Sequence, residues 1–209
     1  MIPVKILSVR YLANAAPALC KALGAPENCP SLGLITTDSD DATYIALDEA
    51  TKASAVQVCY SRSFYAGAAN ASTPNAGEVI GILAGATPGA VRSGMEAVLS
   101  ALERIGFESA GDVPYLAYTV SRSGAFLSKE AGVPEGTALA YLIAPPLESM
   151  YALDAAMKAA DVKLQKLYAP PSETNFGGGL LTGSQSACEA ACVAFGQAVT
   201  EVATNPRGV

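Results

Sequence analysis

Short apolar runs and longer helix-like segments alternate along the chain in two matching series. Runs rich in Val, Ile, Leu and Tyr predict strands, and N-cap or proline signals ahead of longer segments predict helices. The first series predicts strands at Val4–Tyr11, Ser31–Thr36, Val56–Ser61 and Val79–Ala84, and helices over Asp41–Ser54 and from Thr87-Pro88 onward. The second predicts strands at Tyr115–Ser121, Ala138–Ala144, Val162–Tyr168 and Leu180–Thr182, and helices over Leu147–Ala160 and from Ser186 onward.

An internal repeat underlies this order. The string ALDEATKA at Ala46–Ala53 recurs as ALDAAMKA at Ala152–Ala159, and Gly-x-Pro-Glu at Gly24 recurs at Gly132. A weaker match joins Ala90 and Ala187, again in the same order. We therefore predict two diverged copies of one domain, at residues 1–108 and 109–209, with a linker near residues 106–114.

The predicted fold class is α+β. Strands that return through tight turns beside two helices favour, in each copy, a small antiparallel sheet covered by helices. A doubly wound α/β arrangement stays open, because strands and helices also alternate. Asp38, Ser39, Asp40 and Asp41 suit a helix N-terminus, and Ser186 to Glu189 has the spacing of a capping box.

Composition excludes several functions. The 209 residues contain no histidine, which removes Ser-His-Asp and Cys-His nucleophiles and imidazole zinc sites. A net charge of −6 without a cluster of Lys or Arg disfavours nucleic acid, and we expect no membrane span. Five cysteines without a C-x-x-C pair fit reduced, mostly buried thiols. We expect a cytoplasmic protein without cofactor or metal.

Candidate sites each have a simpler explanation. Asp40, with Asp38, Asp41 and Glu78, could bind a cation or an ammonium group, or serve only for capping. The pairs Asp48–Lys52 and Asp154–Lys158 suit exposed helix salt bridges, yet their recurrence equally suits a repeated interface.

Two further features are loops by prediction. Gly177-Gly178-Gly179 lacks the lysine of a phosphate-binding loop, so a flexible loop tip is the simpler interpretation. The segments Tyr65–Gly77 and Ala169–Gly179 are long and equivalently placed, which fits pore gates, ligand lids or plain surface loops.

Several strings make the chain resemble the bacterial microcompartment shell proteins, in particular their tandem-domain ethanolamine-utilisation type. Leu-Asp-x-x-x-Lys-Ala is typical of the family and occurs at Leu47–Ala53 and Leu153–Ala159. Four longer strings carry the narrower likeness, at Ser31–Ala53, Ser61–Ser72, Ala140–Val162 and Pro170–Cys188. The resemblance covers nearly the whole chain.

The resemblance implies a non-catalytic shell subunit of two circularly permuted domains. Three chains would form a homotrimer that mimics a hexagon and tiles with other shell proteins into a facet. Lys52, Lys158 and Arg207 would be tile-edge residues. The gated pore on the three-fold axis would use the loops containing Tyr65, Ala66, Gly67, Asn70, Thr174, Asn175, Phe176 and Gly177.

The resemblance further implies a small ethanolamine-binding pore in each subunit. Asp40 and Glu78 would bind the ammonium group, and Phe107 is the nearest candidate for an aromatic residue there. The rival hypothesis is a small-molecule sensor or enzyme that uses the acidic cluster and the Gly-rich loop. It would show turnover or tight nucleotide binding by the isolated protein.

Overall fold

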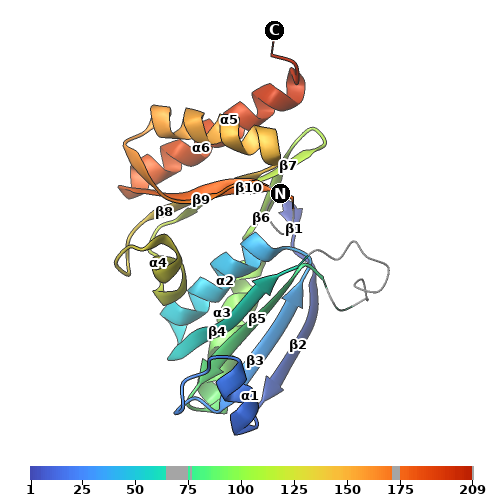
Figure 1. Cartoon of the computed structure of the whole chain (residues 1–209), viewed down its shortest axis with the longest axis vertical. Coiled ribbons are helices and arrows are strands. Elements are labelled where there is room, and N and C mark those ends of the chain that lie inside the picture. Colours follow the sequence, from blue (N-terminus) through green and yellow to red (C-terminus); the bar gives the residue numbers. More distant parts are fainter. Residues whose placement is uncertain (65–74, 76, 171–174, 209) are drawn as a thin grey trace. The chain divides into compact units, whose positions relative to one another are not determined.

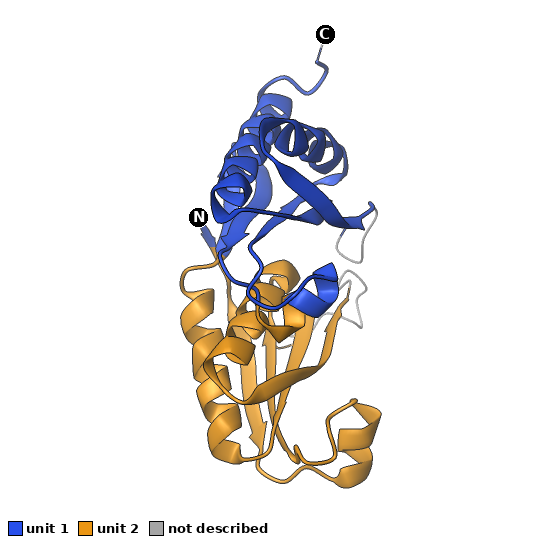
Figure 2. Cartoon of the chain, turned by 90° about the vertical axis from the view of Figure 1, so that its left-hand side faces the viewer, with its two compact units in different colours: residues 1–2, 106–123, 128–209 blue, residues 3–105, 124–127 orange. Residues whose placement is uncertain are grey.

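The computed structural model describes residues 1–64, 75, 77–170 and 175–208, which form two compact units (Figure 2). Unit 2 comprises residues 3–105 and 124–127, and unit 1 comprises residues 1–2, 106–123 and 128–209. The units thus exchange short segments. The predicted domain boundary between residues 108 and 109 stays a prediction. In the structure, the main part of unit 2 ends at residue 105, and unit 1 continues from residue 106.

Unit 2 is a four-stranded antiparallel sheet with helices on it (Figure 1). Its strand order is β2-β3-β5-β4, and every pairing is antiparallel. The elements are β2 (Ile6–Leu12), α1 (Pro17–Ala22), β3 (Ser31–Thr37), α2 (Asp40–Ala53), β4 (Val56–Ser63), β5 (Val79–Gly85) and α3 (Pro88–Leu102).

Period-two alternation assigns the two faces of this sheet. Gly81 and Gly33 lie under α2 and α3, where a Cβ on Gly81 would come within 2.6 Å of Leu47. The glycines therefore let the helices approach the strands closely. The opposite face carries Leu32 and Ile82, which pack with Cys20 of α1. Both faces of the central strands are buried.

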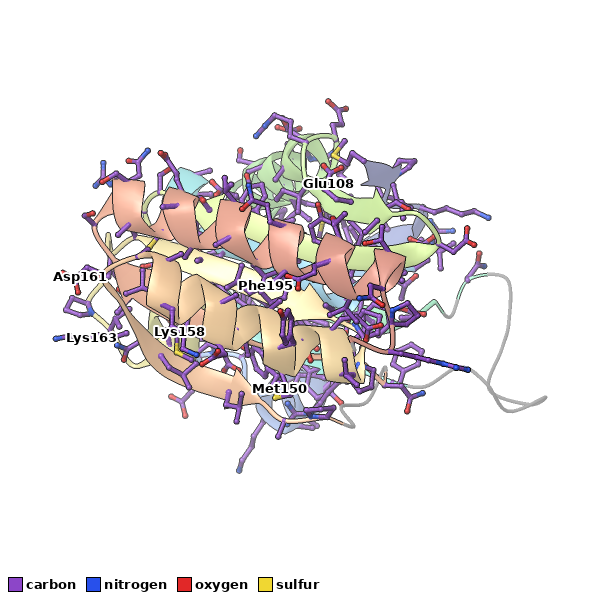
Figure 3. All side chains as sticks on the ribbon, turned by 90° about the horizontal axis from the view of Figure 1, so that it is seen from above. Glu108, Met150, Lys158, Asp161, Lys163 and Phe195 are labelled. Atoms are coloured by element: carbon purple, nitrogen blue, oxygen red, sulfur yellow. The ribbon has the colours of Figure 1, made fainter. Side chains whose placement is uncertain are left out.

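Unit 1 repeats this plan with a wider sheet. The strand order is β1-β6-β7-β8-β10-β9, and β7, β8, β10 and β9 pair antiparallel. Helices α5 and α6 lie side by side on the strands, with Met150 and Lys158 at opposite ends of α5 (Figure 3). Phe195 of α6 is fully buried in the core between them. The elements are β1 (Ile2–Pro3), β6 (Gly106–Ala110), β7 (Val113–Val120), β8 (Leu139–Ala144), α5 (Pro146–Ala159), β9 (Val162–Tyr168), β10 (Gly177–Gly183) and α6 (Gln185–Thr204). Helix α4 (Ala125–Ala131) is divided between the units, since residues 124–127 belong to unit 2.

The predicted α+β class with two tandem domains is confirmed, and the antiparallel pairings rule out a doubly wound sheet. Predicted helix bounds differ from α2 and α5 by a single residue at each end. Within the described residues, no helix is long and apolar enough to cross a membrane.

Three local predictions are wrong. The expected linker at residues 106–114 is the hairpin of β6 and β7, which turns at Gly111 with φ of 63°. The N-cap of α6 is Ser184, which accepts a bond from the Ala187 N–H, so no capping box starts at Ser186. Gly177–Gly179 is no loop tip, because it forms the first part of β10 between β8 and β9.

Candidate functional site

The acidic cluster of unit 2 lies where α2 begins, beside the edge of the sheet. Asp40 opens α2 and is 8% exposed, and its Oδ1 accepts a 2.8 Å bond from the N–H of Asp41. Glu78 directly precedes β5, and its N–H donates to the carbonyl of Thr37 at 2.8 Å. Since Thr37 pairs with Val79, the antiparallel register brings Glu78 to the start of α2. The expected approach of Glu78 to the cluster is therefore seen.

Charge repulsion and burial act together in this cluster. Desolvation raises the pKa of Asp40, and hydrogen bonds, including one from Ser63, partly lower it. Desolvation also raises the pKa of Glu78, and the negative charges of Asp40 and Asp38 raise it further. Ionisation of one carboxylate therefore disfavours ionisation of the other. A cation bound between them would stabilise both charged forms.

Two hydroxyl groups complete the cluster, and no sequence pattern predicts them. Tyr44, one turn into α2, donates to Oγ of Ser63 at the end of β4 over 3.1 Å. Burial raises the pKa of Tyr44 to about 12, so the phenol stays protonated at neutral pH. A long gap in sequence separates the two residues, and only the pairing of β4 with β5 brings Ser63 to this place. The cluster thus combines carboxylates with neutral hydroxyl donors and acceptors.

The capping interpretation holds only in part. Asp38 accepts the N–H of Lys5 at 2.7 Å, across the β2–β3 pair. Ser39 is the N-cap of α2 but makes no side-chain cap bond, and its buried Oγ has no partner among the described residues. Asp40 and Asp41 occupy the first turn, where carboxylates are favoured by the helix dipole.

The remaining predicted ligand and pore residues are distributed as follows. Phe107 belongs to β6 of unit 1, and its ring lies 5.9 Å from that of Phe176. Asn175 has a φ of 65°, and Gly177 opens β10. Tyr65, Ala66, Gly67, Asn70 and Thr174 lie outside the described residues, so the pore assignment stays a prediction.

The two copies of the Asp-x-x-x-Lys helix differ. Asp154 and Lys158 form an exposed pair at 2.6 Å, as an ordinary helix salt bridge would. Asp48 is fully buried, and Lys52 lies 3.7 Å from it and 2.5 Å from Glu49. The reading of Asp48 as an exposed salt-bridge partner is therefore wrong.

Asp48 instead accepts hydrogen bonds from a backbone segment of the second copy. Its two carboxylate oxygens accept the N–H groups of Gly124 at 2.7 Å and of Leu127 at 2.8 Å. Thr51, one turn further along α2, accepts the N–H of Ala125 at 3.0 Å. Burial raises the pKa of Asp48, and these two carboxylate bonds lower it. The contact is a helix cap supplied from residues far away in sequence.

The remaining candidates are metal-ligating side chains, the cysteines and the tile-edge residues. The described residues hold no group of three or more Cys, Asp or Glu side chains suited to a metal ion. Cys188 and Cys192 are buried in the unit 1 core, as predicted, and four of the five free cysteines are buried. Arg207 is exposed after the end of α6. The edge roles of Lys52, Lys158 and Arg207 stay predictions.

Comparisons with known proteins agree with this architecture. A family model described as "BMC domain" matches residues 31–113. The bacterial microcompartment shell protein EutL of Clostridium perfringens is 59% identical over 212 residues, covering 100% of this chain and 98% of that protein. The EutL of Salmonella typhimurium is 48% identical over 210 residues, covering 99% of this chain and 96% of that protein.

Solved structures extend the agreement to three dimensions. The ethanolamine utilization protein EutL of Leptotrichia buccalis superposes with a TM-score of 0.96 at 57% identity, covering 100% of this chain and 98% of that one. The trimeric shell protein PduB, only 19% identical, covers 95% of this chain with a TM-score of 0.78, which shows a shared fold. The relatives are named as shell proteins, so the predicted structural rather than catalytic role is confirmed. The chain belongs to the EutL family of bacterial microcompartment shell proteins.

Proposed function

We propose that the chain builds the shell of an ethanolamine-utilisation microcompartment in the cytoplasm, as a homotrimer with a gated central pore. The observation that carries this proposal is the duplication itself. Each chain supplies two copies of one α+β unit, so three chains supply six similar edges, which is what hexagonal tiling with other shell proteins requires.

The pore and edge roles follow from the same tile. The segments that contain Tyr65 and Phe176 occupy equivalent places in the two copies, so three chains would contribute six such loops around one axis. Lys52 and Lys158 occupy equivalent positions on α2 and α5, where a repeated edge needs equivalent charges. The pore would pass small polar metabolites.

The acidic cluster is proposed to bind ethanolamine. The ammonium group of ethanolamine would lie between Asp40 and Glu78. Its positive charge would offset the repulsion between the two carboxylates and the cost of their desolvation. The ligand's hydroxyl group has partners in the same cluster, at Ser63 and Tyr44. A ligand of this kind, with one cationic and one hydroxyl end, matches both halves of the cluster.

Two measurements test these proposals separately. Light scattering in dilute buffer is expected to give about three times the chain mass of 21.2 kDa. A stable monomer would count against the shell tile. For the ligand site, calorimetric titration with ethanolamine is expected to show binding that Glu78→Gln weakens about tenfold, the effect of losing one charged partner. The matched control is Glu96→Gln, an exposed carboxylate on α3 of the same unit. Equal titrations for both variants would reject the ligand assignment alone.

A further inference from the structure

One face of helix α2 carries both the acidic cluster and the contact with residues 124–127. Asp40, Tyr44 and Asp48 follow one another at intervals of four residues, so their side chains lie on the same face. Asp40 belongs to the acidic cluster, whereas Asp48 accepts the N–H groups of Gly124 and Leu127. Tyr44 therefore lies between the cluster and segment 124–127.

Tyr44 contacts the segment through its ring and the acidic cluster through its hydroxyl group. The ring centroids of Tyr44 and Phe126 are 6.0 Å apart at an interplanar angle of 54°, a tilted arrangement that aromatic pairs favour. The hydroxyl group donates to Oγ of Ser63 over 3.1 Å, and Ser63 in turn is hydrogen-bonded to Asp40. With its proton directed to Ser63, the phenol oxygen keeps a lone pair that can accept a hydrogen bond from a ligand.

The position of Phe126 is fixed by its own backbone. The N–H groups of its two neighbours in sequence, Ala125 and Leu127, donate to side chains of α2 at 3.0 Å and 2.8 Å. The segment approaches α2 so closely that a Cβ on Gly124 would lie 2.8 Å from a backbone carbonyl oxygen of the helix. Anchored backbone thus presents the Phe126 ring to Tyr44, and the ring limits the orientations that the phenol can adopt.

The second copy lacks this arrangement as a whole. Counterparts follow from the equivalent elements α2 and α5, β4 and β9, β5 and β10, and α1 and α4. They are Asp40 and Pro146, Glu78 and Phe176, Ser63 and Ala169, Tyr44 and Met150, and Phe126 and Ala18. Asp48, by contrast, is kept as Asp154. The aromatic pair is therefore replaced together with the acidic cluster and not with the capping carboxylate, which links Tyr44 and Phe126 to the ligand site.

We infer that Tyr44 and Phe126 make the ligand site selective for amines that carry a hydroxyl group. The phenol oxygen of Tyr44 accepts the hydroxyl proton of the ligand, and Phe126 is a positioning residue that holds the phenol in place. This inference rests on the proposed ethanolamine site and adds what discriminates among small amines there. It also gives a residue of the second copy a role in the site of the first.

The discrimination follows from the chemistry of the two ends of the ligand. The carboxylates of Asp40 and Glu78 attract any small ammonium ion, so they do not distinguish ethanolamine from ethylamine, which lacks the hydroxyl group. A site built to bond a hydroxyl group disfavours the analogue without it, because the accepting oxygen is then left without its partner. Burial raises the pKa of Tyr44 to about 12, so the phenol accepts this bond without adding a charge.

Titration calorimetry of the full chain with ethanolamine and with ethylamine tests this selectivity. The wild-type protein is expected to bind ethanolamine about fivefold more tightly than ethylamine, the effect of one neutral hydrogen bond. Tyr44→Phe removes the acceptor and is expected to abolish this preference while the affinity for ethylamine stays within about twofold. The matched control is Tyr11→Phe, which changes a tyrosine that is 41% exposed on β2 of the same unit and should keep the preference.

Phe126→Leu distinguishes positioning from packing. It keeps an apolar side chain and the backbone bonds of the segment, and is expected to lower the preference for ethanolamine about threefold with the affinity for ethylamine unchanged. In a chain that already carries Tyr44→Phe, the same substitution should leave the preference as it is, because Phe126 acts through the phenol. An equal loss for both amines, or an unchanged preference, would overturn the inference and leave the ammonium site standing. A wild-type protein that binds neither amine overturns both.

Discussion

The bonds between Asp48 and residues 124–127 give a quantitative prediction for Asp48→Ala. The substitution removes the acceptor of two buried N–H groups, those of Gly124 and Leu127. An unsatisfied buried donor costs about 1–3 kcal/mol, and loss of a helix cap costs about 0.5–2 kcal/mol. Part of this loss is recovered because the buried carboxylate no longer has to be desolvated, as the raised pKa of Asp48 indicates. We expect a net loss of about 3 kcal/mol in the free energy of unfolding.

Urea denaturation followed by circular dichroism measures this loss, at one fixed protein concentration because assembly stabilises the fold. Asp48→Asn keeps one acceptor oxygen and is expected to lose about half as much. The control is Asp161→Asn, an exposed carboxylate in the turn after α5, with a change of at most about 0.5 kcal/mol (Figure 3).

Hydrogen exchange gives a local check on the same contact. Asp48→Ala is expected to speed exchange in the peptide that contains Gly124 and Leu127, because their N–H groups lose their acceptor. Asp154→Ala should leave that peptide unchanged. If Asp48→Ala matched the control in stability and in exchange, the cap would not be what joins these segments.

Three further outcomes are expected. Lys52→Ala or Lys158→Ala should reduce extended sheets in electron micrographs while the mass in light scattering stays trimeric; intact sheets would contradict the edge role. Ethanolamine affinity, followed by titration calorimetry, should fall as the pH drops through the raised pKa values of Asp40 and Glu78, because protonation removes the charges that bind the cation. The stability of the ligand-free protein depends on pH in the opposite direction. The folded state binds the protons of Asp40 and Glu78 more tightly than the unfolded state does. The free energy of unfolding therefore falls as the pH rises from the ordinary pKa values of these groups to the raised ones. Gly178→Ala should cost about 3 kcal/mol or more, because its Cβ would lie 1.9 Å from a carbonyl oxygen of β8; an unchanged urea midpoint would argue against that packing.

Local pattern was sufficient wherever one element could be identified from its own residues. The apolar alternation of Val162–Tyr168 predicts β9 with its observed bounds. Thr87 followed by Pro88 predicts the N-cap of α3, which the bond from Ala90 N–H to the Thr87 hydroxyl confirms. The repeat of Leu-Asp-x-x-x-Lys-Ala predicts that α2 and α5 are equivalent helices, and both have 14 residues.

Local pattern was insufficient where a distant segment decides the outcome. Consecutive glycines indicate a loop by their own preference, yet Gly177–Gly179 forms a strand because it pairs with β8 and β9. Ser149, Leu142 and neighbouring backbone leave no room for a Cβ there, which explains the glycines. Ser63 enters the acidic cluster only through strand pairing. Nothing around Asp48 distinguishes it from Asp154, and its burial depends on residues 124–127.

The exchange of residues 124–127 also sets an order of events during synthesis on the ribosome. The first 105 residues contain every strand of unit 2, but the acceptors on Asp48 and Thr51 stay unfilled until Leu127 has left the exit tunnel. Domains generally fold as they emerge, N-terminal first. In this chain, unit 2 cannot form its last hydrogen bonds until residues 124–127 have been synthesised. Translation therefore has to continue well beyond the first repeat before that repeat has all its contacts.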